Sequence, residues 1–388
     1  MKQQFDISFP KRVIFRSHGT KTVGTILQGY GFKHTVVLTD AGIKQSGICD
    51  SIVQNLKEAH LEVTLIDSLP REPANTDVDR IMQSIKATSC DNIVAVGGGS
   101  VLDIGKLSAV LTHTPFSVLD LIDGTPVPKH SLFTTLIPTT SGTGAEATKN
   151  AIIAIPERKT KSAVVDEKLL PDLVFLDPQL TINMPFGITT TTGMDALCHA
   201  MECYLSQKAN MMSDMLAIEA IQLIAKSLRT AALNGTDIES RTDMLLASYF
   251  AGTCITLSGT NAVHALSYPL GTVFHIPHGQ SNAMLLPFVM EKNLPSMPQK
   301  CLHIAKAFGY DKAVEVLSPS EYVIRELHQL LKDLEISTSL TSFGIKKTDI
   351  IDFVETAYNN RRLMDNNPVD LSKGEIEAIY LKLLGADQ

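Results

Sequence analysis

Four side chains that can bind a metal ion lie between residues 195 and 278. Asp195 and His199 stand four residues apart, so on a helix both would project from the same face, one turn apart. His264 and His278 follow, and the chain between them contains two prolines and a glycine, which allows it to turn back and bring the second imidazole to the first. Three neutral imidazoles and one carboxylate form a borderline nitrogen and oxygen site that suits Fe²⁺, Zn²⁺, Mn²⁺ or Co²⁺.

The same residues can also be interpreted as polar side chains on helix surfaces. For Asp195 and His199 alone that interpretation would be preferred, because Asp–His pairs at this spacing are common. Four potential ligands in one region of a chain with 11 histidines favour a metal site. Glu202, one turn beyond His199, is either an acceptor for a ligand imidazole N–H or a solvent-facing charge.

A glycine cluster, Gly97–Gly99, follows the apolar run NIVAV and precedes a helical pattern. Glycine lets the backbone approach a ligand closely, and a helix N-terminus offers N–H groups and a positive dipole to a phosphate. The cluster is not a Gly-x-Gly-x-x-Gly fingerprint, and a tight strand-to-helix connection would have the same composition. By itself it does not decide between a phosphate loop and a plain turn.

Asp40 follows the β-branched run HTVVLT. A carboxylate at the end of a strand can accept hydrogen bonds from a ribose 2′-hydroxyl and would repel a 2′-phosphate, which favours NAD over NADP. An aspartate in a turn is also common for purely structural reasons.

A second polar loop, PTTSGTGAE over residues 138–146, follows another apolar run. Its hydroxyls and backbone amides suit phosphate, ribose or amide groups, although ordinary turns use the same small residues. Its value as a cofactor loop depends on whether it lies at the same sheet edge as Gly97–Gly99.

The elements that must position these residues change in kind along the chain. Strand-like runs alternate with helical patterns in the first half, which implies a parallel sheet covered by helices; the strands are expected at residues 34–39, 61–66, 92–96, 132–137, 151–155 and 172–176, and the helices at 43–60 and 78–85. Beyond Asp177-Pro178 the pattern becomes helical, at residues 211–233, 241–257, 318–334 and 348–358. We therefore predict an α/β dinucleotide-binding domain over residues 1–180 and an all-α metal- and substrate-binding domain over residues 181–388, with the ligand between them.

Composition excludes several classes of protein. A chain of 388 residues with 44% apolar residues has ample material for folded cores, and its net charge of −7 argues against a nucleic-acid partner. No apolar run approaches the roughly 20 residues that cross a bilayer, and the N-terminus has no apolar signal segment. The six scattered cysteines do not resemble a disulfide framework. We expect a soluble cytoplasmic protein without membrane or nucleic-acid partners, and a homodimer as the commonest soluble assembly.

In combination, the motifs resemble the iron-containing alcohol dehydrogenase family over nearly the whole chain. The segments that carry the resemblance match in order and spacing: GGGSVLD (97–103), TTSGTGAEAT (139–148), DPQLTINMP followed by TTGMDALCHAMECY (177–204), and NAVHALSYPLG followed by IPHGQSNAMLLP (261–287). The resemblance implies a dehydroquinate-synthase-like fold, with an N-terminal dinucleotide domain and a C-terminal helical metal domain.

The resemblance also implies roles for individual residues. Asp195, His199, His264 and His278 match the metal ligands, with Fe²⁺ as the expected ion and Zn²⁺ or another divalent ion as the alternative. The positions that line NAD in such enzymes correspond to Asp40, Gly98, Gly99, Ser100, Asp103, Thr139, Thr140, Thr143, Lys161 and Leu180.

The chain departs from the family pattern at one position. Many members carry a histidine, thought to help proton movement, four residues after the third ligand, and this chain has Tyr268 there. His275, three residues before His278, either compensates in part or packs in the pocket wall. We assign Tyr268 and His275 as the candidate proton path.

These observations predict a metal-dependent, NAD-linked alcohol dehydrogenase or aldehyde reductase for a small alcohol or carbonyl substrate. In this hypothesis the metal polarises the substrate oxygen and hydride passes between the substrate carbon and the nicotinamide. The alternatives are a metal-free reductase on the same fold that resembles maleylacetate reductase, a glycerol-dehydrogenase-like or cyclising enzyme, and a non-catalytic NAD-binding protein.

Overall fold

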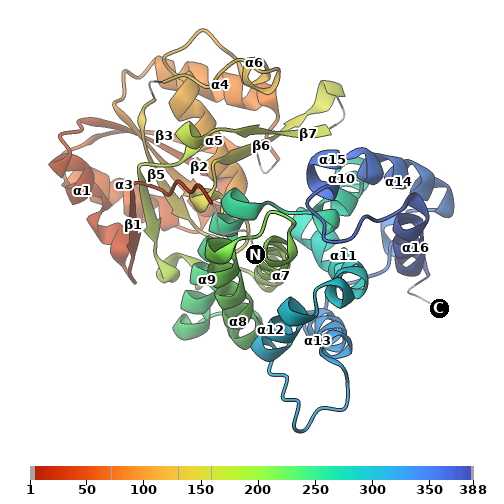
Figure 1. Cartoon of the computed structure of the whole chain (residues 1–388). Helices are drawn as coiled ribbons and strands as arrows, with labels where there is room; N and C mark the ends of the chain where they lie inside the picture. The colour runs from red at the N-terminus through yellow and green to blue at the C-terminus, as the bar shows by residue number, and fades with distance from the viewer. Residues whose placement is uncertain (1–4, 71, 130, 159, 386–388) are drawn as a thin grey trace. The chain divides into compact units, whose positions relative to one another are not determined.

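The structure is a computed structural model that describes residues 5–385 except residues 71, 130 and 159. The chain forms two compact units. One comprises Ser8–Thr140 and Gly144–Asn183, and the other comprises Met1–Ile7, Ser141–Thr143 and Met184–Gln388. The short segment 141–143 therefore groups with the second unit, although its sequence neighbours belong to the first. Figure 1 labels the helices and strands of both units.

The first unit is built on a six-stranded parallel sheet with the order β1-β8-β5-β4-β2-β3. Its strands are β1 (Arg12–Phe15), β2 (His34–Asp40), β3 (Glu62–Leu69), β4 (Asn92–Gly97), β5 (Phe133–Pro138) and β8 (Leu173–Leu176). The strand β1 was not predicted, because it has only four residues, lies at the edge of the sheet and has no buried residue. The chain moves outward from β2 to β3 and then in the opposite direction through β4 and β5, so the order reverses between β2 and β4.

Helices cover both faces of this sheet because neighbouring residues of a buried parallel strand point in opposite directions. Val36 and Leu38 pack in one apolar core with α4 (Asn75–Lys86), α5 (Gly99–Leu111) and α6 (Val118–Ile122). Val37, between them, packs in the other core with α1 (Val23–Gly29) and α3 (Ile48–Glu58).

Two expectations for this unit are corrected. The helix expected over 43–60 is two helices, α2 (Ala41–Gln45) and α3, because Asp40 caps the first and Gly47 interrupts the run with a φ of 80°. The run at 151–155 does form a strand, β6 (Asn150–Ile155), but it pairs antiparallel with β7 (Thr160–Val165) in a separate two-stranded sheet.

The second unit is helical and has its own apolar core. Its helices are α7 (Phe186–Leu205), α8 (Met211–Leu233), α9 (Ile238–Ser258), α10 (Ala262–Phe274), α11 (His278–Asn293), α12 (Pro298–Ala307), α13 (Pro319–Asp333), α14 (Ile350–Asn359), α15 (Arg361–Met364) and α16 (Lys373–Leu384). Among the residues that the structure describes, no helix is both long enough and apolar enough to span a bilayer.

Candidate metal centre and cofactor loops

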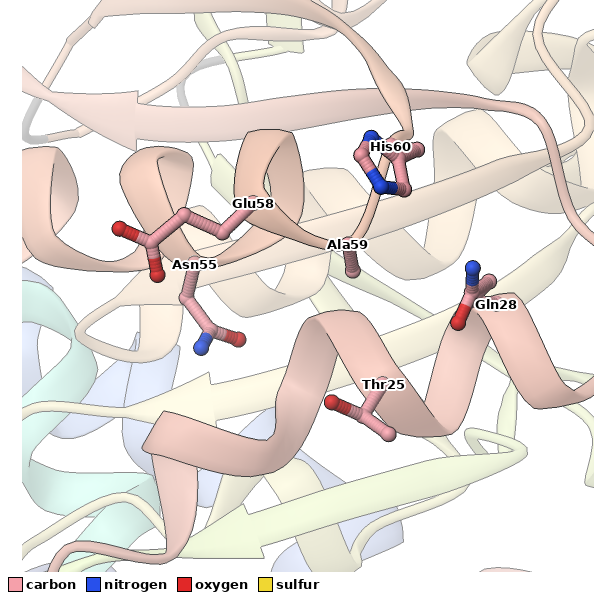
Figure 2. A pocket seen from close by; sticks show the side chains of 6 residues that line it. All are labelled: Thr25, Gln28, Asn55, Glu58, Ala59 and His60. Atoms are coloured by element: carbon pink, nitrogen blue, oxygen red, sulfur yellow. The ribbon is translucent and has the colours of Figure 1, made fainter.

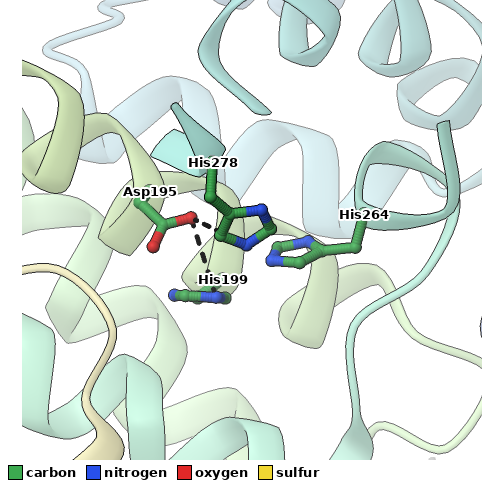
Figure 3. Close-up of side chains that lie close together, drawn as sticks. All are labelled: Asp195, His199, His264 and His278. Atoms are coloured by element: carbon green, nitrogen blue, oxygen red, sulfur yellow. Dashed lines mark ion pairs between the residues drawn. The ribbon is translucent and has the colours of Figure 1, made fainter. Parts of the chain in front are cut away.

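Asp195, His199, His264 and His278 come together in the helical unit (Figure 3). One potential ligand atom from each residue lies within 4.8 Å of those of the other three. The Nε2 atoms of His199 and His278 are each 3.8 Å from Asp195 Oδ1, and the rings of His199 and His264 stack with centroids 4.7 Å apart. This is the separation expected of side chains that could surround one ion.

Three helices supply these side chains. Asp195 and His199 project from one face of α7 at the predicted spacing, His264 lies in the first turn of α10, and His278 is the first residue of α11. Pro269 does not form the turn between the last two histidines, because it lies inside α10, which continues to Phe274. The reversal is made by residues 275–277, where His275 adopts a left-handed conformation with a φ of 55°.

Three of the four side chains are buried and one is partly exposed. Asp195, His199 and His264 are at most 5% exposed, whereas the His278 side chain is 39% exposed. The cluster is therefore most accessible at His278.

Glu202 fixes the orientation of His264. Its side chain is fully buried, one carboxylate oxygen accepts a hydrogen bond from His264 Nδ1, and the other accepts from the backbone N–H groups of Asn261 and Val263 at 3.1 and 2.7 Å. The carboxylate therefore caps the N-terminus of α10, where a negative charge is stabilised, and leaves the lone pair of His264 Nε2 directed into the cluster. The structure thus places Glu202 as the imidazole acceptor and not as a solvent-facing charge.

A backbone carbonyl holds His199 in the same way. His199 Nδ1 lies 3.3 Å from the oxygen of Gly142, which can only accept, so Nδ1 carries the proton and Nε2 keeps its lone pair. Burial lowers the pKa of His199, which favours the neutral imidazole that a metal needs. Sequence reasoning missed this contact, because no local pattern connects residue 142 with residue 199.

Asp195 carries the charge of the cluster. Burial by itself would raise the pKa of this carboxyl, but His199, His278, His264 and a hydrogen bond from Asn282 together bring the pKa below its ordinary value. The site therefore offers one carboxylate and imidazole nitrogens with converging lone pairs, a donor set that fits a divalent first-row ion.

The candidate proton-path residues differ in placement. The Tyr268 ring lies 6.3 Å from the His278 ring, centroid to centroid, and burial raises the pKa of its hydroxyl, although Arg362 opposes this rise. His275 is exposed at the C-terminal end of α10. The structure therefore brings Tyr268, and not His275, beside a candidate ligand ring.

In the first unit, most of the predicted cofactor residues follow the carboxyl ends of neighbouring strands. Asp40 ends β2, Gly98 and Gly99 open α5 after β4, Thr139 and Thr140 follow β5, and Leu180 lies in the short helix Pro178–Thr181 after β8. Because Gly97 pairs with Pro138 and Thr139 N donates to Gly97 O at 3.0 Å, the two polar loops share one sheet edge, as the sequence required of a cofactor site. This edge includes the point between β2 and β4 where the strand order reverses, the usual ligand position in such sheets.

The remaining residues of that set have other surroundings. Asp103 is buried, and its carboxylate accepts from Lys106 Nζ and from Ile152 N, each at 3.0 Å, so it ties α5 to β6. Lys161 lies in β7, and its Nζ is 3.4 Å from Glu72 Oε1. Ser100 is in the first turn of α5, and Thr143 belongs to the segment that groups with the helical unit.

A separate polar pocket of about 320 Å³ lies between α1 and α3 in the first unit (Figure 2). It is lined by Thr25, Gln28, Asn55, Glu58, Ala59 and His60. The Asn55 amide has a structural role there, because it accepts from Gly24 N at 2.8 Å and donates to Lys21 O at 2.6 Å, which joins the two helices.

The parallel-sheet unit with polar loops at its strand ends, together with a buried Asp/His₃ cluster in a helical unit, defines a metal-dependent enzyme of the nucleotide-binding α/β class. The chain belongs to the iron-containing alcohol dehydrogenase family, whose N-terminal part it matches over residues 10–178 and whose C-terminal part it matches over residues 189–384. These matches confirm the predicted family.

Individual relatives cover almost the full chain. It is 37% identical to the long-chain-alcohol dehydrogenase 1 of Geobacillus thermodenitrificans over 354 residues, which are 90% of this chain and 89% of the relative. A crystal structure of 1,3-propanediol oxidoreductase matches with a TM-score of 0.93 and 32% identity over 98% of this chain and 100% of its own. The sulfoacetaldehyde reductase of Bifidobacterium kashiwanohense, solved in complex with NAD⁺, matches with a TM-score of 0.92 and 26% identity over 99% and 100%.

These likenesses confirm the predicted fold class, an α/β unit followed by a helical unit, and the predicted class of enzyme, a metal-dependent alcohol dehydrogenase.

Proposed function

We propose that the chain catalyses reversible hydride transfer between NAD and a small alcohol or its carbonyl product, at a divalent metal ion held by Asp195, His199, His264 and His278. The observation that carries this proposal is the convergence of the four potential ligand atoms within 4.8 Å. A metal-free reductase on the same fold would have no need of this donor set.

The iron-containing family supports Fe²⁺ as the ion, and Zn²⁺ is the main competitor because the Asp/His₃ donor set suits both. When bound, the ion supplies Lewis-acid polarisation of the substrate oxygen and NAD supplies the hydride acceptor. The protein contributes oriented ligands, since Glu202 and Gly142 fix the protons of His264 and His199 on the nitrogens that face away from the cluster.

NAD is proposed to bind at the carboxyl ends of β2, β4, β5 and β8. The N-terminus of α5, formed by Gly98–Ser100, suits the pyrophosphate, and Asp40 suits the ribose hydroxyls. Thr139 supports a polar ligand at this edge, because its Oγ1 is buried and has no hydrogen bond within the described part of the chain. The relative solved with NAD⁺ is consistent with this choice of cofactor.

Tyr268 is proposed to take part in the movement of the alcohol proton. Its ring lies beside that of His278, and its hydroxyl, which is protonated near neutral pH as in other tyrosines, can donate a hydrogen bond. His275, exposed at the end of α10, is proposed as the group that exchanges protons with solvent.

The experiment that tests the proposed function is the substitution His264→Ala. We expect the variant to lose metal, measured by elemental analysis of the purified protein, and to lose NAD-linked oxidation of alcohols. Titration with NAD should still give binding close to that of the wild type, because the proposed NAD residues do not include His264. Normal turnover by metal-free His264→Ala protein would overturn the proposal.

We further propose that the active protein is a cytoplasmic homodimer, the commonest closed assembly of soluble chains. Light scattering during gel filtration measures the assembly, and a monomer of 42.2 kDa would contradict it.

A further inference from the structure

Asn282 is a fully buried amide at the centre of the ligand cluster. It lies in α11 one turn after His278, so both side chains project from the same face of the helix. Its Nδ2 is 2.7 Å from Asp195 Oδ1 and 3.2 Å from the Nε2 atoms of both His264 and His278. One amide group therefore contacts three of the four candidate ligands.

The orientation of this amide follows from the groups around it. The oxygen of Asp195 is an acceptor, and only the NH₂ end of an asparagine can donate to it. The Nε2 atom of His264 is an acceptor too, because its Nδ1 donates to Glu202, so the opposite orientation would direct the amide carbonyl oxygen at two acceptors.

This orientation has a cost at the other end of the amide. Asn282 Oδ1 is buried and has no hydrogen bond among the described residues, a condition that destabilises the folded state. The same orientation that gives Asp195 a hydrogen bond from Asn282 Nδ2 therefore leaves Asn282 Oδ1 without one.

We propose that Asn282 is a positioning residue of the metal centre, whose N–H group fixes the carboxylate of Asp195 in the orientation required to bind the ion. This inference rests on the proposed function. An ionised carboxylate has about four lone-pair sites, so Asp195 can accept from Asn282 and still ligate a metal.

Asn282 then completes a pattern in which three of the four candidate ligands are each held by one fixed partner. The Glu202 carboxylate holds His264, the Gly142 carbonyl holds His199, and the Asn282 amide holds Asp195. Partners of this kind orient metal ligands and tune the affinity of the site.

The test compares Asn282→Leu and Asn282→Ala with the wild type. Leucine has the branched shape of asparagine without its hydrogen bonds but is larger, and alanine avoids any clash that leucine could introduce. Asn293→Leu is the matched control, because Asn293 is also a fully buried amide of α11 but donates to Asn367 Oδ1 at 2.8 Å, away from the ligands.

The measurements are the affinity for Co²⁺, by competition with a chelator, and the visible absorption spectrum of the bound Co²⁺, which reports ligand geometry. We expect both Asn282 variants to bind Co²⁺ about 10–100-fold more weakly with an altered spectrum, and Asn293→Leu to match the wild type in both. Folded Asn282 variants with wild-type affinity and spectrum would overturn the inference. A wild-type protein that binds no Co²⁺ would instead overturn the proposed function on which it rests.

Discussion

At the scale of single residues, the candidate metal centre depends on the partners of the ligands as much as on the ligands. A histidine can bind a metal only through an unprotonated nitrogen, so the group that accepts from its other nitrogen decides whether the ring is ready to ligate. Glu202 performs this role for His264 and at the same time caps α10.

The first prediction concerns this carboxylate. Glu202→Gln keeps the size of the side chain but removes the charge that fixes His264, so we expect the affinity for Zn²⁺ to fall by about 10–100-fold in a chelator competition. Glu219→Gln, at an exposed position of α8, is the control and should bind Zn²⁺ like the wild type. Equal affinities of the two variants would contradict the role of Glu202.

The second prediction concerns Glu146, which is buried in the first unit and has an oxygen without a hydrogen bond among the described residues. Burial raises the pKa of its carboxyl from 4.5 to about 7, opposed by Lys106 and supported by Asp103. The unfolded chain therefore loses this proton at lower pH than the folded protein. Ionisation of Glu146 thus reduces the free energy of unfolding as the pH rises from about 4.5 to about 7, and the full loss persists above pH 7.

Glu146→Gln removes this titration. We expect the variant to gain stability over the wild type progressively across that range, up to about 3 kcal/mol at 1.36 kcal/mol per pKa unit. Urea unfolding at a series of pH values measures the difference, and a difference that does not change with pH would refute the raised pKa.

At the scale of elements, glycines let backbone segments approach α7 closely where it carries its ligands. A Cβ on Gly142 would lie 2.6 Å from Thr192 Cβ and 2.8 Å from its carbonyl oxygen, and one on Gly279 would lie 2.2 Å from Thr191 O. These contacts place the carbonyl of Gly142 and the first turn of α11 against the turn of α7 that precedes Asp195. The geometry of the cluster is therefore set by backbone packing as well as by side chains.

The third prediction tests this packing. Gly142→Ala should displace segment 141–143 from α7, lengthen the contact with His199, and so weaken metal binding together with thermal stability. Gly187→Ala is the control, since a Cβ at this exposed position of α7 meets nothing within 4 Å and should leave metal binding unchanged. A chelator competition should show weaker metal binding by Gly142→Ala than by Gly187→Ala. If Gly142→Ala bound the metal as tightly as the wild type, the packing argument would be wrong.

At the scale of the whole molecule, the two units have separate cores and separate sets of proposed ligand residues. The four candidate metal ligands all lie in the helical unit, and all the proposed NAD residues except Thr143 lie in the other unit. Each ligand should therefore stabilise chiefly the unit that binds it.

The fourth prediction follows from this separation. Zn²⁺ at about 1,000 times its dissociation constant should stabilise the native state by roughly 4 kcal/mol and slow hydrogen exchange in the helical unit, around α7, α10 and α11. NAD should slow exchange at the ends of β2, β4 and β5. Mass spectrometry of peptides after exchange separates the two patterns, and protection by Zn²⁺ confined to the sheet would contradict the proposed metal site.

The sequence alone determined the features that follow from the regular geometry of helices and strands. On a helix, the i and i+4 spacing of Asp195 and His199 places both side chains on one face. The apolar runs form parallel strands, and parallel pairing brings the loops after β4 and β5 to one edge of the sheet. The motifs also identified the family, because their order and spacing are sequence properties.

Only the tertiary structure decided what depends on packing between distant segments. It showed that Glu202 is buried and accepts from His264, and that Gly142 and Asn282 contact candidate ligands. It also showed that Pro269 lies inside a helix and that Gly47 divides the helix predicted over 43–60. The contacts of Glu202, Gly142 and Asn282 follow no sequence periodicity. Each joins residues that are far apart along the chain and meet only because the helices and loops pack together. The ligands could therefore be read from the sequence, whereas the groups that orient them could not.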